Sequence, residues 1–300
     1  MRRRSSVLLA GGAMAIAAML IGASAGSGNS PAASLSLMGG GPPQAPAVAP
    51  AAPAAPARDL DALAKRATVE AQKRGADISL TLLDRRTGQL VSSGDGAAFP
   101  IASVAKLFIA DDLLSQAAQR KTKLSPQDLG ALDVMLRSSD DFPADDFWTR
   151  GGGNAIISRV ADRYNLTGTT APYDGNWWNT MSTTSDLVRY YELLLDGAGG
   201  LPAKQAGVIL ADLAASTPTG ADGYPQRFGI PDGLFAESVA VKQGWMCCWG
   251  LGNQVHLSTG VVGRDRRYVI AIASMQPVDE ATARDTITGT LKTMFPRGTI

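Results

Sequence analysis

The chain has 300 residues, enough for one large domain or two small ones, with 45% hydrophobic residues and a formal charge of +1. The apolar fraction is sufficient for a sizeable core, and the near-neutral charge provides no basic surface for nucleic acid. Two adjacent cysteines and one histidine, His256, exclude nearly every zinc site and Cys/His dyad, so we expect no metal and no cofactor.

The first 25 residues have the pattern of a secretory signal peptide. Three arginines precede an apolar run from Val7 to Ile21, and Ala23-Ser24-Ala25 supplies a small-residue cleavage site. An uncleaved membrane anchor is the alternative, because the run up to Ala25 is almost long enough to span a bilayer. No cysteine lies directly after the run, which excludes a lipid anchor there. We expect a secreted or periplasmic cell-envelope protein that has no membrane segment in its mature form.

Residues 26–57 are rich in alanine, proline, glycine and serine and carry no charge. Such a segment cannot bury enough surface to offset the entropy of ordering it, so it is expected to be a disordered tether. The composition changes at Arg58, and one domain of β-strands and helices is expected over residues 58–300, as a monomer.

Hydrophobic periodicity predicts the elements of this domain. Apolar residues at helical spacing follow Asp59, and alternating apolar residues after Ile78 predict a hairpin that returns at Gln89. Strands at both ends with helices between them indicate an α+β domain, in which helices flank an antiparallel sheet and form a second, all-helical lobe. The remaining predicted helices are 103–118, 126–137, 154–164, 184–195, 202–215 and 279–294, and the remaining strands are 239–243, 252–262 and 268–275.

A serine and a lysine at helical spacing form the first candidate site. In Ser103-Val104-Ala105-Lys106, positions i and i+3 share one helix face, so Ser103 Oγ and Lys106 Nζ can approach each other. A serine hydroxyl needs a neighbouring base to become a nucleophile, and burial makes the neutral amine of a lysine available for that task. Taken alone the pattern is common, and a solvated helix cap is the simpler explanation of it.

Two further motifs follow in the chain, Ser139-Asp140-Asp141 and Lys242-Gln243-Gly244. With Ser103-x-x-Lys106 before them, they resemble the three ordered motifs of the serine β-lactamase and penicillin-binding-protein superfamily, and the class A β-lactamases in particular. The likeness covers most of Leu60 to Phe295 and implies a β-lactamase/transpeptidase-like fold with a cleft between the two lobes.

The resemblance implies a role for each motif residue. Ser103 would be the acylated nucleophile and Lys106 the acceptor of its proton. Ser139 would pass that proton to the leaving group, and Lys242 would support Ser139 and bind a substrate carboxylate. Trp245, the residue after the third motif, would share an oxyanion hole with Ser103 through their backbone N–H groups.

The other motif positions, Asp141, Gln243 and Gly244, would bind substrate together with Trp245, but two of them depart from the family pattern. Asp141 replaces an asparagine that can both donate and accept hydrogen bonds, and an ionised carboxylate only accepts. Gln243 replaces a hydroxyl residue and keeps an amide donor.

The segment from Leu166 to Met181 departs from the pattern as well. In this segment a class A enzyme would supply a glutamate that activates the deacylating water, and Asp174 is the only acid present. A missing general base costs about 10²–10⁴ in rate, so efficient β-lactam hydrolysis is not expected.

Two functions fit these residues. The first is a serine hydrolase, β-lactamase-like or D-alanyl-D-alanine peptidase-like, that is acylated at Ser103 by a β-lactam or a cell-wall peptide and turns over slowly. The second is a catalytically inactive protein that binds cell-wall fragments in the same cleft.

Some neighbouring residues have alternative interpretations. Cys247 and Cys248 form either a vicinal disulfide or two separate thiols. The tryptophans beside them, and Trp177-Trp178, serve either packing or an aromatic platform for a sugar or peptide. Asp111-Asp112 is interpreted as a solvated helix face, although one carboxylate could pair with an arginine.

Overall fold

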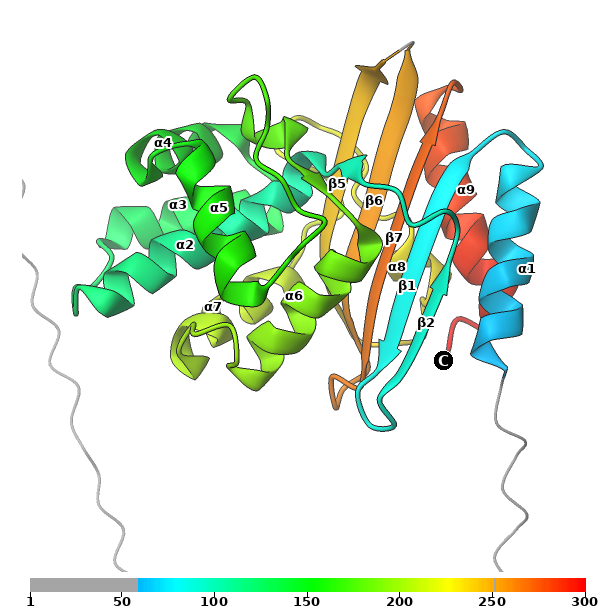
Figure 1. Ribbon diagram of the computed structural model, residues 1–300, viewed down its shortest axis with the longest axis horizontal. Helices are drawn as coiled ribbons and strands as arrows, with labels where there is room; N and C mark the ends of the chain where they lie inside the picture. Colours follow the sequence, from blue (N-terminus) through cyan, green and yellow to red (C-terminus); the bar gives the residue numbers. More distant parts are fainter. Residues whose placement is uncertain (1–58, 251) are drawn as a thin grey trace, which may run out of the picture. The chain divides into compact units, whose positions relative to one another are not determined.

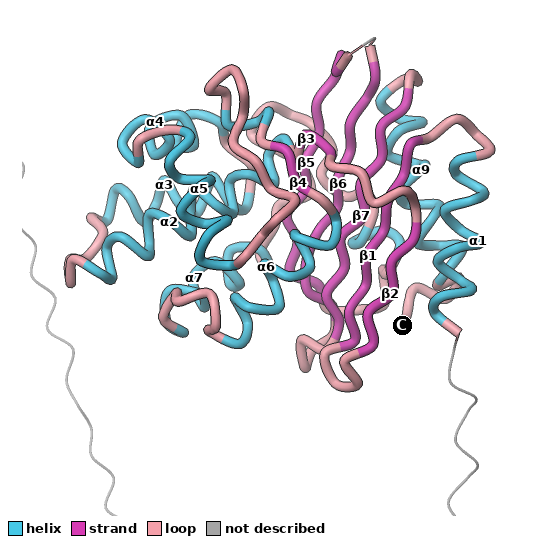
Figure 2. The backbone as a smooth tube through the Cα atoms, viewed as in Figure 1, coloured by secondary structure: helices cyan, strands magenta, loops and turns pink. Residues whose placement is uncertain are grey.

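The computed structural model describes residues 59–250 and 252–300. The expected signal peptide and tether, residues 1–57, lie outside this part, so that division of the chain stays a prediction. The described residues form an α+β domain in which an antiparallel sheet lies between a lobe of helices and a second, thinner helical layer (Figures 1 and 2). The predicted fold class is confirmed.

The main sheet joins the two ends of the domain. The first strand pairs with the last along its whole length, from Asp77 opposite Met275 to Asp84 opposite Tyr268. The strand that carries Lys242 is an edge strand, so one of its sides is open to the helical lobe. The order across the sheet is β2 (Gln89–Ser93), β1 (Asp77–Asp84), β7 (Tyr268–Gln276), β6 (Asn253–Val262) and β5 (Val239–Trp249).

Helices cover both faces of this sheet. Ile78, Leu80 and Leu82 of β1 pack with α1 (Leu60–Gln72) and α9 (Glu280–Met294) in one core, whereas Leu83 belongs to the core of the other lobe. Successive side chains of a strand point to opposite faces, so a strand covered on both sides is buried almost throughout, as β1 is. The short α8 (Ile230–Gly233) contacts α9 on the same side of the sheet.

In the helical lobe, α2 (Ala105–Gln119) is the central helix. Its Asp111 is fully buried, where it accepts a hydrogen bond of 2.5 Å from the Tyr164 hydroxyl and pairs with Arg163. Asp112 is buried against Arg159. The interpretation of these two acids as a solvated face is therefore wrong, and the alternative, pairing with an arginine, is confirmed for both. The surrounding helices are α3 (Pro126–Arg137), α4 (Asp141–Gly151), α5 (Asn154–Tyr164), α6 (Thr184–Asp196) and α7 (Ala203–Ala214).

Side-chain caps fix several helix starts. Ser125 accepts a hydrogen bond of 3.0 Å from Asp128 N at the start of α3, where Pro126 occupies the first helical position. Thr183 caps α6 and Asp279 caps α9 in the same way. These caps are local in sequence, so the predicted helix boundaries agree with the structure within about two residues.

Three elements near the candidate site differ from prediction. The helix expected from Ser103 begins at Ala105, because a 3₁₀ turn, η1 (Ala102–Val104), precedes it. The helix α4 was not predicted; Asp140 caps it, accepting from Phe142 N at 3.0 Å. The strand expected to end at Gln243 continues as β5 to Trp249.

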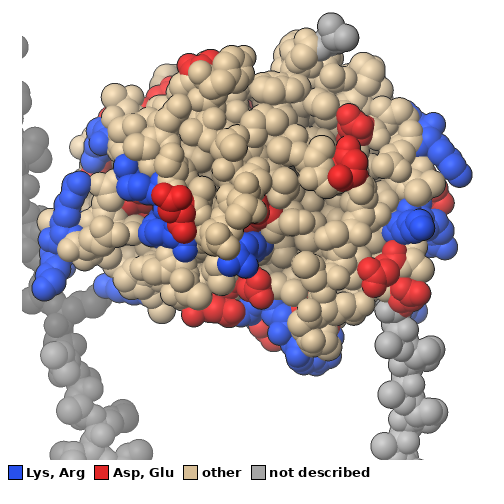
Figure 3. All heavy atoms as spheres, in the orientation of Figure 1, with Lys and Arg blue, Asp and Glu red and all other residues tan. Residues whose placement is uncertain are grey.

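On the face shown in Figure 3, charged side chains of both signs are scattered over the left, lower and right parts, and the upper middle is largely uncharged. Within residues 59–250 and 252–300, none of the helices combines the length and the apolar character needed to cross a membrane.

Candidate active site

Ser103 lies on a tight turn between the two lobes. The short strand β3 (Phe99–Pro100) pairs with β4 (Met181–Ser182), and Ile101 N then donates a hydrogen bond of 2.8 Å to Thr180 O. The turn that follows has a left-handed residue, Ala102, with φ of +45°. This sharp change of direction ends one strand and starts α2, and Ser103 lies at the junction with 7% of its surface exposed.

Lys106, in the first turn of α2, is fully buried and has three polar contacts. Its Nζ lies 2.9 Å from Ser103 Oγ, 2.6 Å from Ser139 O and 2.5 Å from Asp141 Oδ1. It also lies 4.8 Å from the centre of the Trp177 ring. The lysine is therefore held in one position, with the serine hydroxyl within hydrogen-bonding distance.

The other two motif residues meet at the same point. Ser139 follows α3 with φ of +58°, so its carbonyl faces Lys106 while its hydroxyl faces β5. Lys242 Nζ lies 2.5 Å from Ser139 Oγ and is 1% exposed. Ser139 thus bridges the two lysines, and the structure brings together four side chains that span 139 positions of sequence.

Burial perturbs both lysines. Desolvation lowers the pKa of Lys106 below its usual range, and the nearby Asp141 carboxylate opposes that shift by favouring the ammonium. Desolvation lowers the pKa of Lys242 well below its usual range, and the neighbouring Lys106 adds to the effect. Each amine is thus easier to deprotonate than a lysine in water, a property expected of a general base.

A cavity of about 380 Å³ opens in front of Ser103. Its walls come from both lobes and from the loop around η2 (Trp177–Asn179), and they are mainly aromatic and acidic. The side chains that matter for its chemistry are Ser103, Asp141, Trp177, Trp178, Asp222 and Trp245.

The four residues expected to bind substrate have different environments. Asp141 and Trp245 line the cavity. Gln243 does not: it is 1% exposed, and its amide nitrogen donates to Gln226 O at 3.1 Å and Phe228 O at 2.5 Å. The Gln243 side chain therefore holds the backbone of the loop before α8 in place and does not face the cavity.

Gly244 brings β5 close to the serine turn. A β-carbon added to it would lie 2.6 Å from Ile101 O and 3.1 Å from Val104 Cγ2. Glycine at this position permits the close approach of strand and turn, and Gly244 is not among the residues that line the cavity.

Two further residues at the site, Asp222 and Tyr224, were not predicted; they lie in the loop between α7 and α8. Asp222 Oδ2 accepts from Trp245 Nε1 at 3.2 Å, and the Tyr224 ring stacks on Trp245 at 4.8 Å between centres and 9° between planes. The Tyr224 hydroxyl in turn lies 2.6 Å from Nε2 of the buried His256. The sequence around Asp222 contains glycine and proline, which indicate a turn but do not identify residues that the turn contacts elsewhere in the chain.

The acid of the 166–181 segment, Asp174, lies away from the cavity lining. It accepts hydrogen bonds from the side-chain amides of Asn176, at 2.8 Å, and Asn179, at 2.7 Å. Asp174 thus organises its own loop, and Trp177 is tied by its Nε1 to Asp145 on α4 at 2.7 Å.

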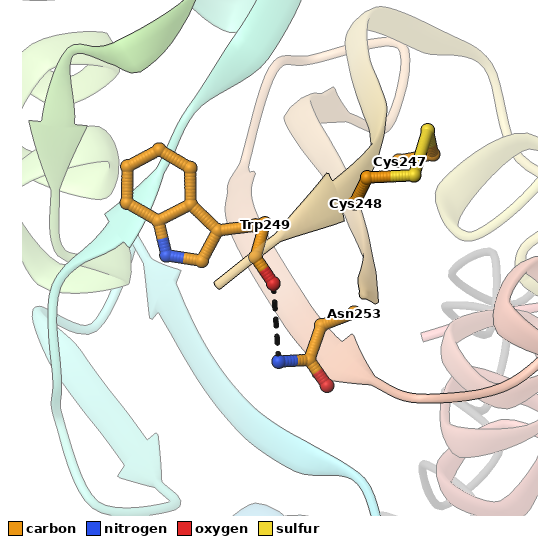
Figure 4. The surroundings of a disulfide bond; sticks show 4 residues. All are labelled: Cys247, Cys248, Trp249 and Asn253. Carbon is orange, nitrogen blue, oxygen red and sulfur yellow. Dashed lines mark hydrogen bonds between the residues drawn. A yellow bond between two sulfur atoms is a disulfide. The ribbon is translucent and has the colours of Figure 1, made fainter. Parts of the chain in front are cut away.

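The two cysteines form a vicinal disulfide at the end of β5, where the Asn253 side-chain amide donates to Trp249 O (Figure 4). The Trp249 ring and the disulfide point away from each other in this view. Cys247 also lines the cavity, so the disulfide lies at its rim.

No family model matches the chain. Proteins from Mycobacterium tuberculosis and Mycobacterium bovis named "Putative lipoprotein LppW" are 60% identical over 259 residues, which cover 86% of this chain and 81% of theirs. The extended-spectrum β-lactamase TLA-3 superposes with a TM-score of 0.66 at 12% identity, over 79% of this chain and 98% of its own. The protein PBP-A does so with a TM-score of 0.64 at 18% identity, over 81% and 97%. The chain has the fold of class A β-lactamases and PBP-A, and it belongs to the LppW family.

Proposed function

We propose that this protein is an exported serine acyl-transfer enzyme that is acylated at Ser103. The observation that carries the proposal is the distance of 2.9 Å between Lys106 Nζ and Ser103 Oγ, with the amine buried and the hydroxyl at the edge of a cavity. A buried amine next to a hydroxyl is the arrangement that makes serine a nucleophile when no histidine serves as base. His256 is engaged with Tyr224, so it is not a competing base.

In the first step Ser103 Oγ attacks the carbonyl carbon of the substrate, and its proton moves to the neutral Nζ of Lys106. The carbonyl oxygen becomes an oxyanion, and the backbone N–H groups of Ser103 and Trp245 are proposed to stabilise it. The tetrahedral intermediate then collapses: the bond to the leaving group breaks and an ester on Ser103 remains.

The leaving group needs a proton as that bond breaks. Ser139 supplies it from its hydroxyl, which contacts Lys242 Nζ in this structure. The Ser139 side chain then rotates toward Lys106, whose Nζ now contacts the Ser139 carbonyl, and the alkoxide is reprotonated from the ammonium of Lys106. Lys242 Nζ donates a hydrogen bond of 2.5 Å to Ser139 Oγ and supports this relay, because a hydrogen-bond donor stabilises a developing alkoxide. The proton taken from Ser103 thus leaves with the amine or alcohol product.

Hydrolysis of the ester is proposed to be slow. Residues 166–181 contain no glutamate, and Asp174 is occupied by Asn176 and Asn179. A missing base for the water costs about 10²–10⁴ in rate. Weak or absent β-lactam turnover is therefore expected, with a β-lactam or a cell-wall peptide as the acyl donor.

One observation favours a second candidate, a cell-wall binding protein without catalysis. Asp141 Oδ1 lies 2.5 Å from Lys106 Nζ, and a carboxylate so close favours the ammonium, which cannot accept a proton. Burial of Lys106 opposes this effect, and we favour the enzyme because the serine–lysine distance is short.

Intact mass spectrometry separates the two candidates. The full chain is incubated with a labelled penicillin and, separately, with a neutral activated ester, and we expect a covalent adduct with at least one of the two that Ser103→Ala abolishes. The matched control is Ser158→Ala, an exposed serine on α5, which should label like the wild type. Absence of an adduct with both reagents would leave only the binding protein.

Export to the cell envelope is part of the proposal. It is supported by the expected signal peptide in residues 1–25 and by the lipoprotein name of the 60% identical relatives. Both cysteines of this chain lie in β5, so the cysteine that carries a lipid anchor after a signal peptide is not found in this sequence. Comparing the mass of the exported protein with that of the full chain tests cleavage near Ala25.

A further inference from the structure

The charges that a ligand would meet in the cavity are carboxylates. Asp141 and Asp222 both line it and both are exposed, with 67% of the Asp141 side chain accessible. The two lysine amines of the site are not accessible, because Lys106 is 0% and Lys242 1% exposed and both point at serine oxygens. A bound molecule therefore meets negative charge in front of the nucleophile.

Both carboxylates act on the same centre, although one comes from α4 and the other from the loop between α7 and α8. Asp141 is paired directly with Lys106, and the charge of Asp222 influences both Lys106 and Lys242. Asp222 is held by its hydrogen bond to Trp245 Nε1, so its position relative to the cavity is fixed.

The aromatic walls add to the preference for positive charge. A cation is attracted to the face of a tryptophan ring, and the Lys106 ammonium already lies 4.8 Å from the centre of Trp177. Trp178 and Trp245 line the same cavity, and stacking on Tyr224 holds Trp245 in place. The Arg284 guanidinium lies over the Tyr224 ring and does not line the cavity, so it does not offset the two carboxylates there.

We infer that this cavity selects acyl donors that carry a primary ammonium beside the reacting carbonyl and disfavours donors with a carboxylate there. The inference rests on the proposed acylation of Ser103 and names the substrate class of that site. An ammonium between tryptophan rings and two carboxylates gains attraction from both, whereas a carboxylate is repelled. We expect about tenfold tighter binding for the ammonium than for a neutral group of the same size, and about tenfold weaker binding for the carboxylate.

Three amides of N-acetyl-glycyl-D-alanine test the charge preference. They end in an aminoethyl, a propyl or a carboxymethyl group, so they differ in charge and little in size. Binding is measured by calorimetry on the full chain with Ser103→Ala, so that it does not depend on catalysis. The order ammonium, neutral, carboxylate is expected; an equal affinity for all three, the reverse order, or no binding up to millimolar concentration would overturn the inference.

Two variants locate the effect. Asp222→Asn should reduce the ratio of ammonium to propyl affinity about three- to tenfold, because it removes one carboxylate and keeps the shape. Asp162→Asn, an exposed acid on α5, changes the net charge equally and should leave the ratio as it is. An equal effect of the two variants would mean that net charge, rather than the cavity, sets the preference.

Labelling of the wild type by a neutral p-nitrophenyl ester tests the proposed function separately. If the three amides bind in the expected order but the ester does not label Ser103, the acyl-transfer function is wrong and the preference for an ammonium stands. If the ester labels Ser103 but the three amides bind equally, the acyl-transfer function stands and the preference for an ammonium is wrong.

Discussion

The carboxylate of Asp141 controls how much of Lys106 is available as a base. Asp141→Asn keeps an oxygen acceptor for the lysine and removes the negative charge 2.5 Å from Nζ. Because that charge raises the pKa of Lys106, its loss lowers the pKa further, in the same direction as burial does. At any pH below that pKa the variant then holds more neutral amine, and acylation of Ser103 should be faster.

The size of the effect follows from the exposure of the pair. Opposite charges 4 Å apart attract by about 4 kcal/mol near a protein surface and by about 1 kcal/mol in water. The Asp141 side chain is 67% exposed, which places the pair toward the solvent-screened end, at about 1–2 kcal/mol. Since 1.36 kcal/mol corresponds to a factor of ten, we expect about tenfold faster acylation on the acidic side of the pH profile.

The assay is the rate of adduct formation at Ser103 with a neutral p-nitrophenyl ester, followed by intact mass across pH. The acidic limb of the profile should move to lower pH, and the plateau at high pH should be equal in the two proteins. The control is Asp146→Asn, an exposed acid of α4 that pairs with Arg150 and not with Lys106. Slower acylation at every pH would refute the reasoning, because the carboxylate would then be part of the proton transfer itself.

Three other outcomes are expected. Gly244→Ala should lower the free energy of unfolding by about 1–3 kcal/mol and slow acylation, because its β-carbon would lie 2.6 Å from Ile101 O. Thermal unfolding and ester labelling measure the two effects. Gly207→Ala is the control, because its β-carbon would contact nothing within 4 Å and should change neither. The Arg267 guanidinium lowers the pKa of Asp84 from 3.8 to about 2. The ion pair should therefore contribute about 2 kcal/mol to the free energy of unfolding above pH 4, and this contribution should disappear as the pH falls toward 2. Urea unfolding of Asp84→Asn should not show this decrease, and an equal pH dependence in the two proteins would contradict the prediction. Iodoacetamide should modify neither cysteine of β5 before reduction and both after it, and modification without reductant would show that the thiols are free.

Local chemistry made much of the fold predictable. The boundaries of α3, α6 and α9 follow from caps and periodicity within a few residues, because a cap satisfies backbone groups of its own helix. The order of the three motifs was likewise sufficient to expect the fold, and the chain proved to have it. The state of the two cysteines remained open, because two thiols and a vicinal disulfide have the same sequence.

Partners distant in sequence could not be predicted in this way. Gln243 was expected in the cleft, but its amide is consumed by the backbone of the loop before α8. Asp111 was predicted to lie on a solvated helix face, but it is buried, where it contacts Arg163 and Tyr164. The polarity of a residue does not indicate whether distant residues will satisfy it in the core.

The amino-acid sequence by itself determined most of the element types, the nucleophile candidate and the spacing that sets Ser103 beside Lys106, because these depend on contacts within one turn of chain. Only the tertiary structure decided that Lys242 reaches Ser139 and that Asp222 lies beside Trp245 at the same cavity. Those contacts depend on how two lobes pack around an edge strand, and packing is settled by the burial of the whole core rather than by any local pattern.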